Sequence, residues 1–224
     1  MEKTLEELVN KLAKKEMKKI FYEVANEIMI EVTKKVLKEV VDTLILDGKT
    51  VATMESCTGG GLAHYITNIP GASSAFRLGI ATYSNEAKIN VGGVPRETID
   101  KYTVYSMETA NDMARMVVTH LGDNYGVGIT GQLKRVDPSN PYGSSDEVHI
   151  SVYDATLDKY YNKSIVVTSK KREENKIQVI CEASLMLLAA IKFSKDFDMV
   201  FANNSDNQQG VTSNNTHQTR VRKQ

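Results

Sequence analysis

The feature that most restricts the fold is a long N-terminal segment without a helix breaker. From Leu5 to Leu46 the chain contains neither Gly nor Pro, and apolar residues recur at intervals of three or four positions. This spacing predicts α-helix, with Gly48 in "LDGK" as the C-terminal cap. The apolar pattern changes phase near residues 12–17, so one long helix and two consecutive helices fit equally well. The phase change indicates a bend or a change of packing partner there.

The rest of the chain alternates predicted strands and helices. Strands are expected at "KTVATM" (49–54), "AFRLGIATY" (75–83) and "YGVGIT" (125–130), and a hairpin at "EVHISVYD" and "YYNKSIVVT". Helices are expected at "LAHYITNI", at "PRETIDKY", from Ser106 to His120 and from Arg172 to Phe193. This order predicts the α/β class, a layered α/β/α fold with a mixed sheet, plus an extra N-terminal amphipathic helix.

Composition narrows the class of protein. Lys and Arg number 28 and so do Asp and Glu, so the net charge does not favour nucleic acid or an anionic membrane as a partner. The two cysteines, Cys57 and Cys181, are far apart in sequence, and the four histidines lack metal-ligand spacing. The longest apolar stretch, "SLMLLAAIKF", is too short to cross a bilayer, and the N-terminus lacks a secretory signal. A cytoplasmic protein is expected.

The stretch "MESCTGGGLAHYI" (54–66) joins a predicted strand to a predicted helix through three glycines. Such a corner can bind an anion, because glycines allow close approach and the first helical N–H groups point outward. Ser56 and Thr58 add hydroxyl groups to the same corner. The segment lacks the Lys of a phosphate-binding P-loop, so a purely structural tight turn explains it equally well.

Further motifs resemble one family. "ESCTGG", followed by "IPGASSAF", "TYSNEAK", "GVP-ETI" and "TG" in that order, is similar to the C-terminal domain of the competence/damage-inducible CinA family. The resemblance covers about residues 45–193. It implies a CinA-like α/β domain, placed at 31–196. Residues 1–30 are a helical extension beyond the family pattern, and the polar, low-complexity residues 197–224 are expected to form a flexible tail. It also implies nicotinamide mononucleotide deamidase activity, with no metal and no cofactor.

The resemblance assigns roles to residues that match the motifs. Deamidation needs a nucleophile, a base and donors for a tetrahedral oxyanion. Ser56 would be the nucleophile, Lys88 the base, and Tyr83 would orient the base or contact the substrate. Ser73 is a competing nucleophile. The other implied substrate-binding residues are Thr58, Gly59 and Gly60 as oxyanion donors, Thr130 and Gly131 after the third strand, and Arg172 as a phosphate ligand.

Each assignment also has a structural alternative. Ser56 could cap a helix, Lys88 could be a solvated surface lysine, and Tyr83 could be a core residue. Arg172 lies in the charged run "SKKREENK", which is typical of a solvated helix start. Cys57 is expected to be packed rather than reactive, and Glu55 to accept backbone N–H groups.

The sequence departs from the family pattern in three places, the first being the additional residues 1–30. After Thr130 and Gly131, the glycine-rich loop typical of the family is replaced by "QLKRVDPSNPYGSSD", so side chains such as those of Leu133 and Lys134 could narrow or close a pocket. Of the paired arginines expected near the last helix, Arg172 is kept and Lys176 takes the second place. The chain is therefore a divergent relative.

Three functions fit these features. The first is an amidohydrolase acting on nicotinamide mononucleotide or a related pyridine nucleotide. The second is a catalytically inactive CinA-like binding or scaffold module, which uses its N-terminal helix for oligomerisation or for a protein partner. The third is a nucleotide sensor without hydrolysis. The amphipathic stripe of residues 1–30 must be buried against its own domain, a second copy or another protein, and a homo-oligomer is expected.

Overall fold

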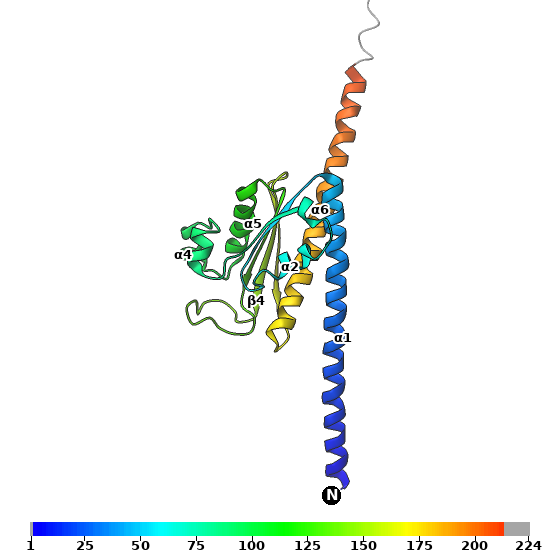
Figure 1. Ribbon diagram of the computed structural model, residues 1–224, viewed down its shortest axis with the longest axis vertical. Coiled ribbons are helices and arrows are strands. Elements are labelled where there is room, and N and C mark those ends of the chain that lie inside the picture. The colour runs from blue at the N-terminus through cyan, green and yellow to red at the C-terminus, as the bar shows by residue number, and fades with distance from the viewer. Residues whose placement is uncertain (1, 213–224) are drawn as a thin grey trace, which may run out of the picture.

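The computed structural model describes residues 2–212, and its centre is a five-stranded mixed sheet between two layers of helices (Figure 1). The strand order is β2-β1-β3-β4-β5. The strands are β1 (Val51–Glu55), β2 (Phe76–Ala81), β3 (Tyr125–Gly131), β4 (Glu147–Asp154) and β5 (Lys159–Val166). β1 runs parallel to β2 and β3, whereas β4 is antiparallel to β3 and β5. The predicted α/β class with a mixed sheet is therefore confirmed.

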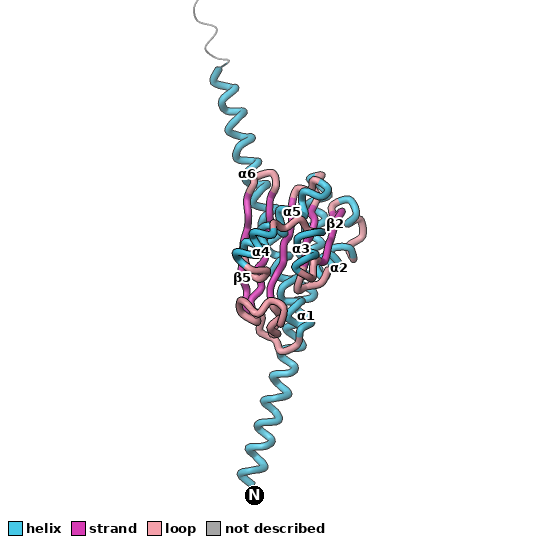
Figure 2. The backbone as a smooth tube through the Cα atoms, turned by 90° about the vertical axis from the view of Figure 1, so that its left-hand side faces the viewer, coloured by secondary structure: helices cyan, strands magenta, loops and turns pink. Residues whose placement is uncertain are grey.

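Helices cover both faces of the sheet (Figures 1 and 2). One face packs against α1 (Glu2–Asp47), α2 (Gly61–Thr67) and α6 (Arg172–Thr212), and the other against α5 (Met107–Leu121). The short helices α3 (Asn85–Asn90) and α4 (Arg96–Tyr102) lie between β2 and α5 in the chain, and a 3₁₀ turn spans Ala72–Ser74. Neither α3 nor the 3₁₀ turn was expected from the sequence.

The larger apolar core lies between the sheet and the layer of α1, α2 and α6. Leu37 and Leu44 of α1 meet Val51 of β1 and Leu187 of α6 there, all fully buried. A smaller cluster, which includes Met54 and Met113, joins the other face of β1 and α5. Because β1 is buried on both faces, the short apolar run at 51–54 is explained by its central position.

α1 is one continuous helix rather than two. Its last part packs on the domain, where Thr33, Leu37, Val40, Val41 and Leu44 are buried. Its first part extends beyond the domain, and residues 10–24 are exposed throughout (Figure 1). The phase change near residues 12–17 therefore marks no break in the helix.

α6 is longer than predicted, because it continues past Phe193 to Thr212. Residues 197–212, expected in the polar tail, are helical, and residues 213–224 lie outside the described part of the chain. The segment Arg172–Lys195 is long and apolar enough to cross a bilayer by length and composition, contrary to the estimate from "SLMLLAAIKF" alone. Half of its apolar window is buried inside the protein.

Candidate active site

Ser56 and Lys88 meet at the carboxyl edge of the parallel strands. Ser56 directly follows β1, and Lys88 lies on α3, soon after the adjacent strand β2. Because the carboxyl ends of parallel strands lie at one edge of a sheet, both residues reach the same place. Lys88 Nζ is 3.0 Å from Ser56 Oγ. Both side chains are buried: Lys88 is 2% exposed and Ser56 is 6% exposed.

The position of Lys88 depends on α3, a helix of only six residues. Ser84 caps this helix, because its Oγ accepts a hydrogen bond from the Ala87 N–H at 3.1 Å. Lys88 Nζ also donates to the Thr82 carbonyl oxygen at 2.8 Å. Burial lowers the pKa of Lys88 to about 8, and the negative charge of Asp137 acts in the opposite direction. A substantial neutral fraction of the amine is therefore present near neutral pH.

The three glycines have a structural role. Gly59 and Gly60 adopt φ of +67° and +86°, which favours glycine, and a Cβ on Gly61 would lie 2.6 Å from Cδ1 of Ile180 in α6. The triple glycine thus forms a sharp turn against which α6 packs closely.

The first amides of α2 already have a partner and are therefore not available to an anion. The buried carboxylate of Glu55 accepts hydrogen bonds from the Leu62 and Ala63 N–H groups at 3.0 and 2.9 Å. Glu55 therefore holds the turn, as the structural alternative predicted. The Gly59 N–H donates to the Ser56 carbonyl oxygen at 3.0 Å and is also engaged.

Thr58, Gly59 and Gly60 do not line the cavity beside Ser56. Thr58 is buried, and its hydroxyl has no hydrogen-bond partner within residues 2–212. Cys57 does line the cavity, but burial raises the pKa of its thiol to about 12, so it is a packed residue and not a thiolate nucleophile.

Tyr83 and Arg172 lie at the open side of the cavity. Tyr83 is 64% exposed, and its hydroxyl accepts a hydrogen bond of 3.1 Å from Arg172 Nη2. Both residues line the cavity. Lys176 lies one helical turn beyond Arg172, and its Nζ is 3.3 Å from a Cβ built on Gly59. The second cation therefore sits beside the glycine turn and not in the cavity wall.

The remaining predicted site residues divide between the cavity and the core. Gly131 lines the cavity, whereas Thr130 is buried and donates through Oγ1 to the Val104 carbonyl oxygen at 2.6 Å. Ser73 is exposed and lies in the 3₁₀ turn before β2, at the opposite end of the parallel strands from Ser56. The structure thus separates Ser73 from Lys88.

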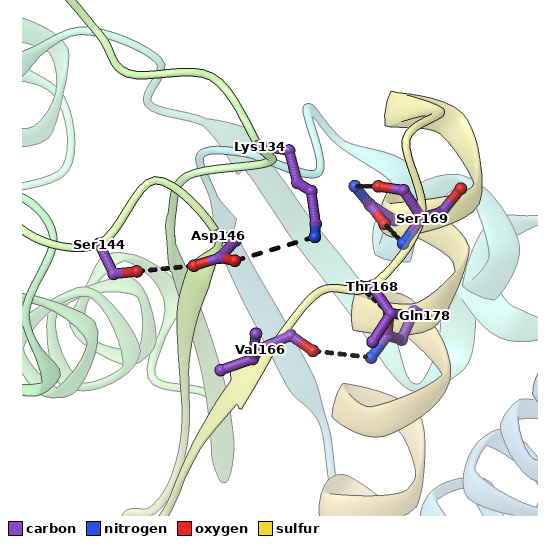
Figure 3. Close-up of polar contacts among 8 residues, drawn as sticks. Lys134, Ser144, Asp146, Val166, Thr168, Ser169 and Gln178 are labelled. Carbon is purple, nitrogen blue, oxygen red and sulfur yellow. Dashed lines mark hydrogen bonds and ion pairs between the residues drawn. The ribbon is translucent and has the colours of Figure 1, made fainter.

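The unusual loop after Gly131 forms one wall of a cavity of about 710 Å³. Its lining residues from the loop are Gln132, Leu133, Arg135, Val136, Asp137, Pro138, Ser139 and Asn140. Leu133 is buried in the larger core, and Lys134 turns toward Asp146, 3.8 Å away (Figure 3). Neither of these two side chains closes the cavity, so the expected obstruction is absent.

Hydrogen bonds hold this loop in place. Gln132 is buried; its amide donates to the Tyr142 carbonyl oxygen at 3.0 Å and accepts from the Asp137 N–H at 3.1 Å. The Asp137 carboxylate accepts from the Tyr105 hydroxyl at 2.9 Å and from the Asn140 amide at 2.8 Å. The loop is therefore an ordered wall.

These contacts also change the acidities of the loop residues. Hydrogen bonds, the largest from Asn140, lower the pKa of Asp137. Burial and the bond to Asp137 raise the pKa of Tyr105. Asn85 of α3 donates to Asn140 at 2.8 Å and ties the loop to the helix that carries Lys88. Sequence reasoning missed Tyr105, Asp137 and Asn140; the only signal was the turn-forming "DPSNP".

Hydrogen bonds also hold the segment between β5 and α6 in place (Figure 3). Gln178 Nε2 donates to the Val166 carbonyl oxygen at 3.2 Å, and the Ser169 N–H donates to Asn175 Oδ1 at 2.9 Å. These bonds fix the start of α6 and hence Arg172. Among the described residues, no group of three or more His, Cys, Asp or Glu side chains could hold a metal ion.

A sequence profile described as "CinA C-terminal domain" matches residues 33–191. Among curated proteins, the chain is 42% identical over 127 residues to a protein of Caldanaerobacter subterraneus subsp. tengcongensis named as a competence-damage inducible protein. It is 49% identical over 88 residues to a Clostridium botulinum protein of the same name. These alignments cover 55% and 39% of this chain, but only 29% and 22% of the relatives.

Solved structures give the same result. The competence/damage inducible protein CihA from Agrobacterium tumefaciens superposes with a TM-score of 0.64 at 27% identity, over 70% of this chain and 94% of that one. A CinA superfamily protein from Klebsiella pneumoniae gives a TM-score of 0.63 at 23% identity, over 72% of this chain and 98% of that one. The α/β domain is therefore shared, whereas the profile match begins only at residue 33.

Proposed function

The chain belongs to the CinA C-terminal domain family, and from this premise we propose that it is an amidohydrolase. Its substrate would be nicotinamide mononucleotide or a related pyridine nucleotide, and its products the corresponding acid and ammonia. The observation that carries the proposal is the 3.0 Å contact between Ser56 Oγ and Lys88 Nζ in the wall of an open cavity.

The surroundings of Lys88 suit a general base. The Thr82 carbonyl oxygen can only accept, so it takes an N–H of the amine and leaves the lone pair of neutral Lys88 available to Ser56. A pKa of about 8 gives a usable fraction of neutral amine near pH 7. Lys88 would take the hydroxyl proton while Ser56 Oγ forms a bond to the carboxamide carbon.

The tetrahedral intermediate then breaks its C–N bond. Protonated Lys88 returns the proton to the leaving nitrogen, so ammonia departs and an acyl ester remains on Ser56. Water, deprotonated by the same amine, hydrolyses that ester and restores both residues. We assign oxyanion stabilisation to the backbone N–H of Cys57, because Cys57 follows the nucleophile and lines the cavity, whereas Thr58, Gly59 and Gly60 do not.

The mouth of the cavity suits an anionic, aromatic substrate. Arg172 and Arg135 line it and supply positive charge for a phosphate. The exposed ring of Tyr83 offers an aromatic surface beside them, suited to a pyridine ring. The arginines favour a mononucleotide over free nicotinamide, because both compounds carry the pyridine ring but only the mononucleotide carries a phosphate.

The test is ammonia release by the purified full-length chain. Nicotinamide mononucleotide, nicotinamide riboside and nicotinamide would be compared at equal concentration near pH 8, with the acid product measured by chromatography. We expect turnover in that order of preference, because only the mononucleotide carries a phosphate. No ammonia and no acid from the mononucleotide would contradict the proposal.

A second candidate, a binding module without hydrolysis, is favoured by the exposed first half of α1. Titration calorimetry with the same three compounds separates the possibilities. Binding without product would indicate a nucleotide sensor, whereas neither binding nor product would favour a scaffold role.

A further inference from the structure

The protruding half of α1 carries an apolar surface that its own domain does not cover. We call Met17, Ile20, Phe21, Val24 and Ile28 the outer stripe; their exposed fractions range from 48% to 71%. A continuous apolar surface of this kind on a protein usually marks an interaction site.

The outer stripe faces away from the domain. Ile28 and the buried Leu37 are nine positions apart, about two and a half helical turns, so they lie on opposite sides of α1. Figure 1 shows no other element against the side of α1 that faces away from the sheet. Lys35 and Asp42 continue this side of α1 along the domain and are exposed.

We infer that a second copy of this chain covers the outer stripe, in an antiparallel helix pair centred between Tyr22 and Glu23. Residues 10–24 are exposed throughout, and helices in proteins gain most of their stability from packing of an apolar face, which their own chain does not supply here. A shared seam between two copies supplies it.

The apolar pattern is its own mirror image about that centre. Reversing the direction of one helix places Met17 opposite Ile28, Phe21 opposite Val24, and Ile20 opposite Ala25. A twofold interface requires this property, because residue i must contact j while j contacts i. An unrelated partner would not require a palindromic stripe.

Charge selects the antiparallel direction. Reversal about that centre places Lys14 opposite Glu31 and Lys18 opposite Glu27, whereas Lys15 lies on the far side of α1 from the outer stripe. In an antiparallel pair, the lysine-rich part of one copy lies beside the glutamates of the other. A parallel pair would align like charges, which is unfavourable.

The first test is the oligomeric state of the full-length chain by sedimentation and light scattering. We expect a dimer at micromolar concentration.

Val24→Asp should raise the dimer dissociation constant about a hundredfold or more, because it places a carboxylate in the seam of each helix. Lys15→Asp is the matched control: Lys15 lies nine positions from Val24, on the opposite side of α1, and the variant should remain dimeric. A monomeric wild type, or an unchanged Val24→Asp dimer, would overturn the inference.

Cysteine pairing tests the register. An oxidised mixture of the single variants Met17→Cys and Ile28→Cys should form a disulfide-linked dimer of one copy of each. Either variant alone should not, because its two thiols would lie about 16 Å apart along the pair, beyond the reach of a disulfide. The native Cys57 and Cys181 are buried and do not compete. Efficient cross-linking of either variant alone would overturn the antiparallel register. Neither test depends on amidohydrolase activity.

Discussion

The glycine turn at 59–61 and the polar loop at 132–143 lie near the same edge of the sheet, yet only the loop lines the cavity beside Ser56. The turn resembles a ligand-binding corner, but its glycines serve packing against Ile180 and its helix amides are held by Glu55. The loop was expected to obstruct a pocket, but it forms the cavity wall. Consecutive glycines after a strand therefore do not by themselves identify a ligand-binding site, and larger side chains in a loop do not exclude one.

Replacing the nucleophile gives the largest expected effect. Ser56→Ala should lower kcat/KM for nicotinamide mononucleotide by at least about a thousandfold, because the attacking oxygen is lost. Ser73→Ala is the matched control and should keep full activity, since Ser73 is outside the cavity. Ammonia release measures both. Loss of activity in Ser73→Ala with retention in Ser56→Ala would reverse the assignment.

The pH profile is expected to be the next largest effect. Lys88 must be neutral to act as a base, so kcat/KM should rise about tenfold per pH unit up to its pKa of about 8 and then level off. Initial rates between pH 6 and pH 9 measure this. A flat profile would exclude Lys88 as the titrating base.

Stability should follow the same group. The pKa of Lys88 is lower in the folded chain than its usual 10.5, so between about 8 and 10.5 the unfolded chain binds more protons. The contribution of Lys88 to the free energy of unfolding therefore rises with pH in that window and is unfavourable below it. In Lys88→Met this pH dependence should disappear, as measured by urea unfolding at several pH values.

The glycine turn should affect stability and spare the chemistry. Gly60→Ala should cost about 1–2 kcal/mol of unfolding free energy, because alanine at φ +86° is strained while the site has room for a Cβ. Its kcat/KM should stay within about twofold of wild type. Urea unfolding and ammonia release measure the two effects. A large loss of kcat/KM in a variant that still folds would show that the glycine turn contributes to catalysis.

Substitutions in the loop after Gly131 should weaken substrate binding and leave stability almost unchanged, and the expected effect is smaller. Asn140→Ala removes the bonds to Asp137 and to Asn85, which loosens the cavity wall. We expect KM for the mononucleotide to rise several-fold, with kcat and the unfolding midpoint little changed. Ser144→Ala is the control, because Ser144 bonds only Asp146 outside the cavity (Figure 3). Equal effects of the two substitutions would show that the wall does not shape substrate binding.

Local patterns predicted most of the fold. Helical spacing and the Ser106 cap marked α5, whose Ser106 Oγ accepts from the Thr109 N–H as expected, and alternation marked the β4–β5 hairpin. α3 was missed because its six residues hold too few turns for a periodic signal. That omission mattered, because α3 carries Lys88.

The sequence by itself determined the family, the layer order and the pair of residues, Ser56 and Lys88, on which the proposed chemistry rests. Those features depend on local propensity and on motifs that are contiguous in the chain. Only the tertiary structure decided that Thr58 and Ser73 stay out of the cavity and that the loop after Gly131 forms a wall. These outcomes depend on contacts between side chains that are distant in sequence, and the spacing of residues along the chain does not determine such contacts.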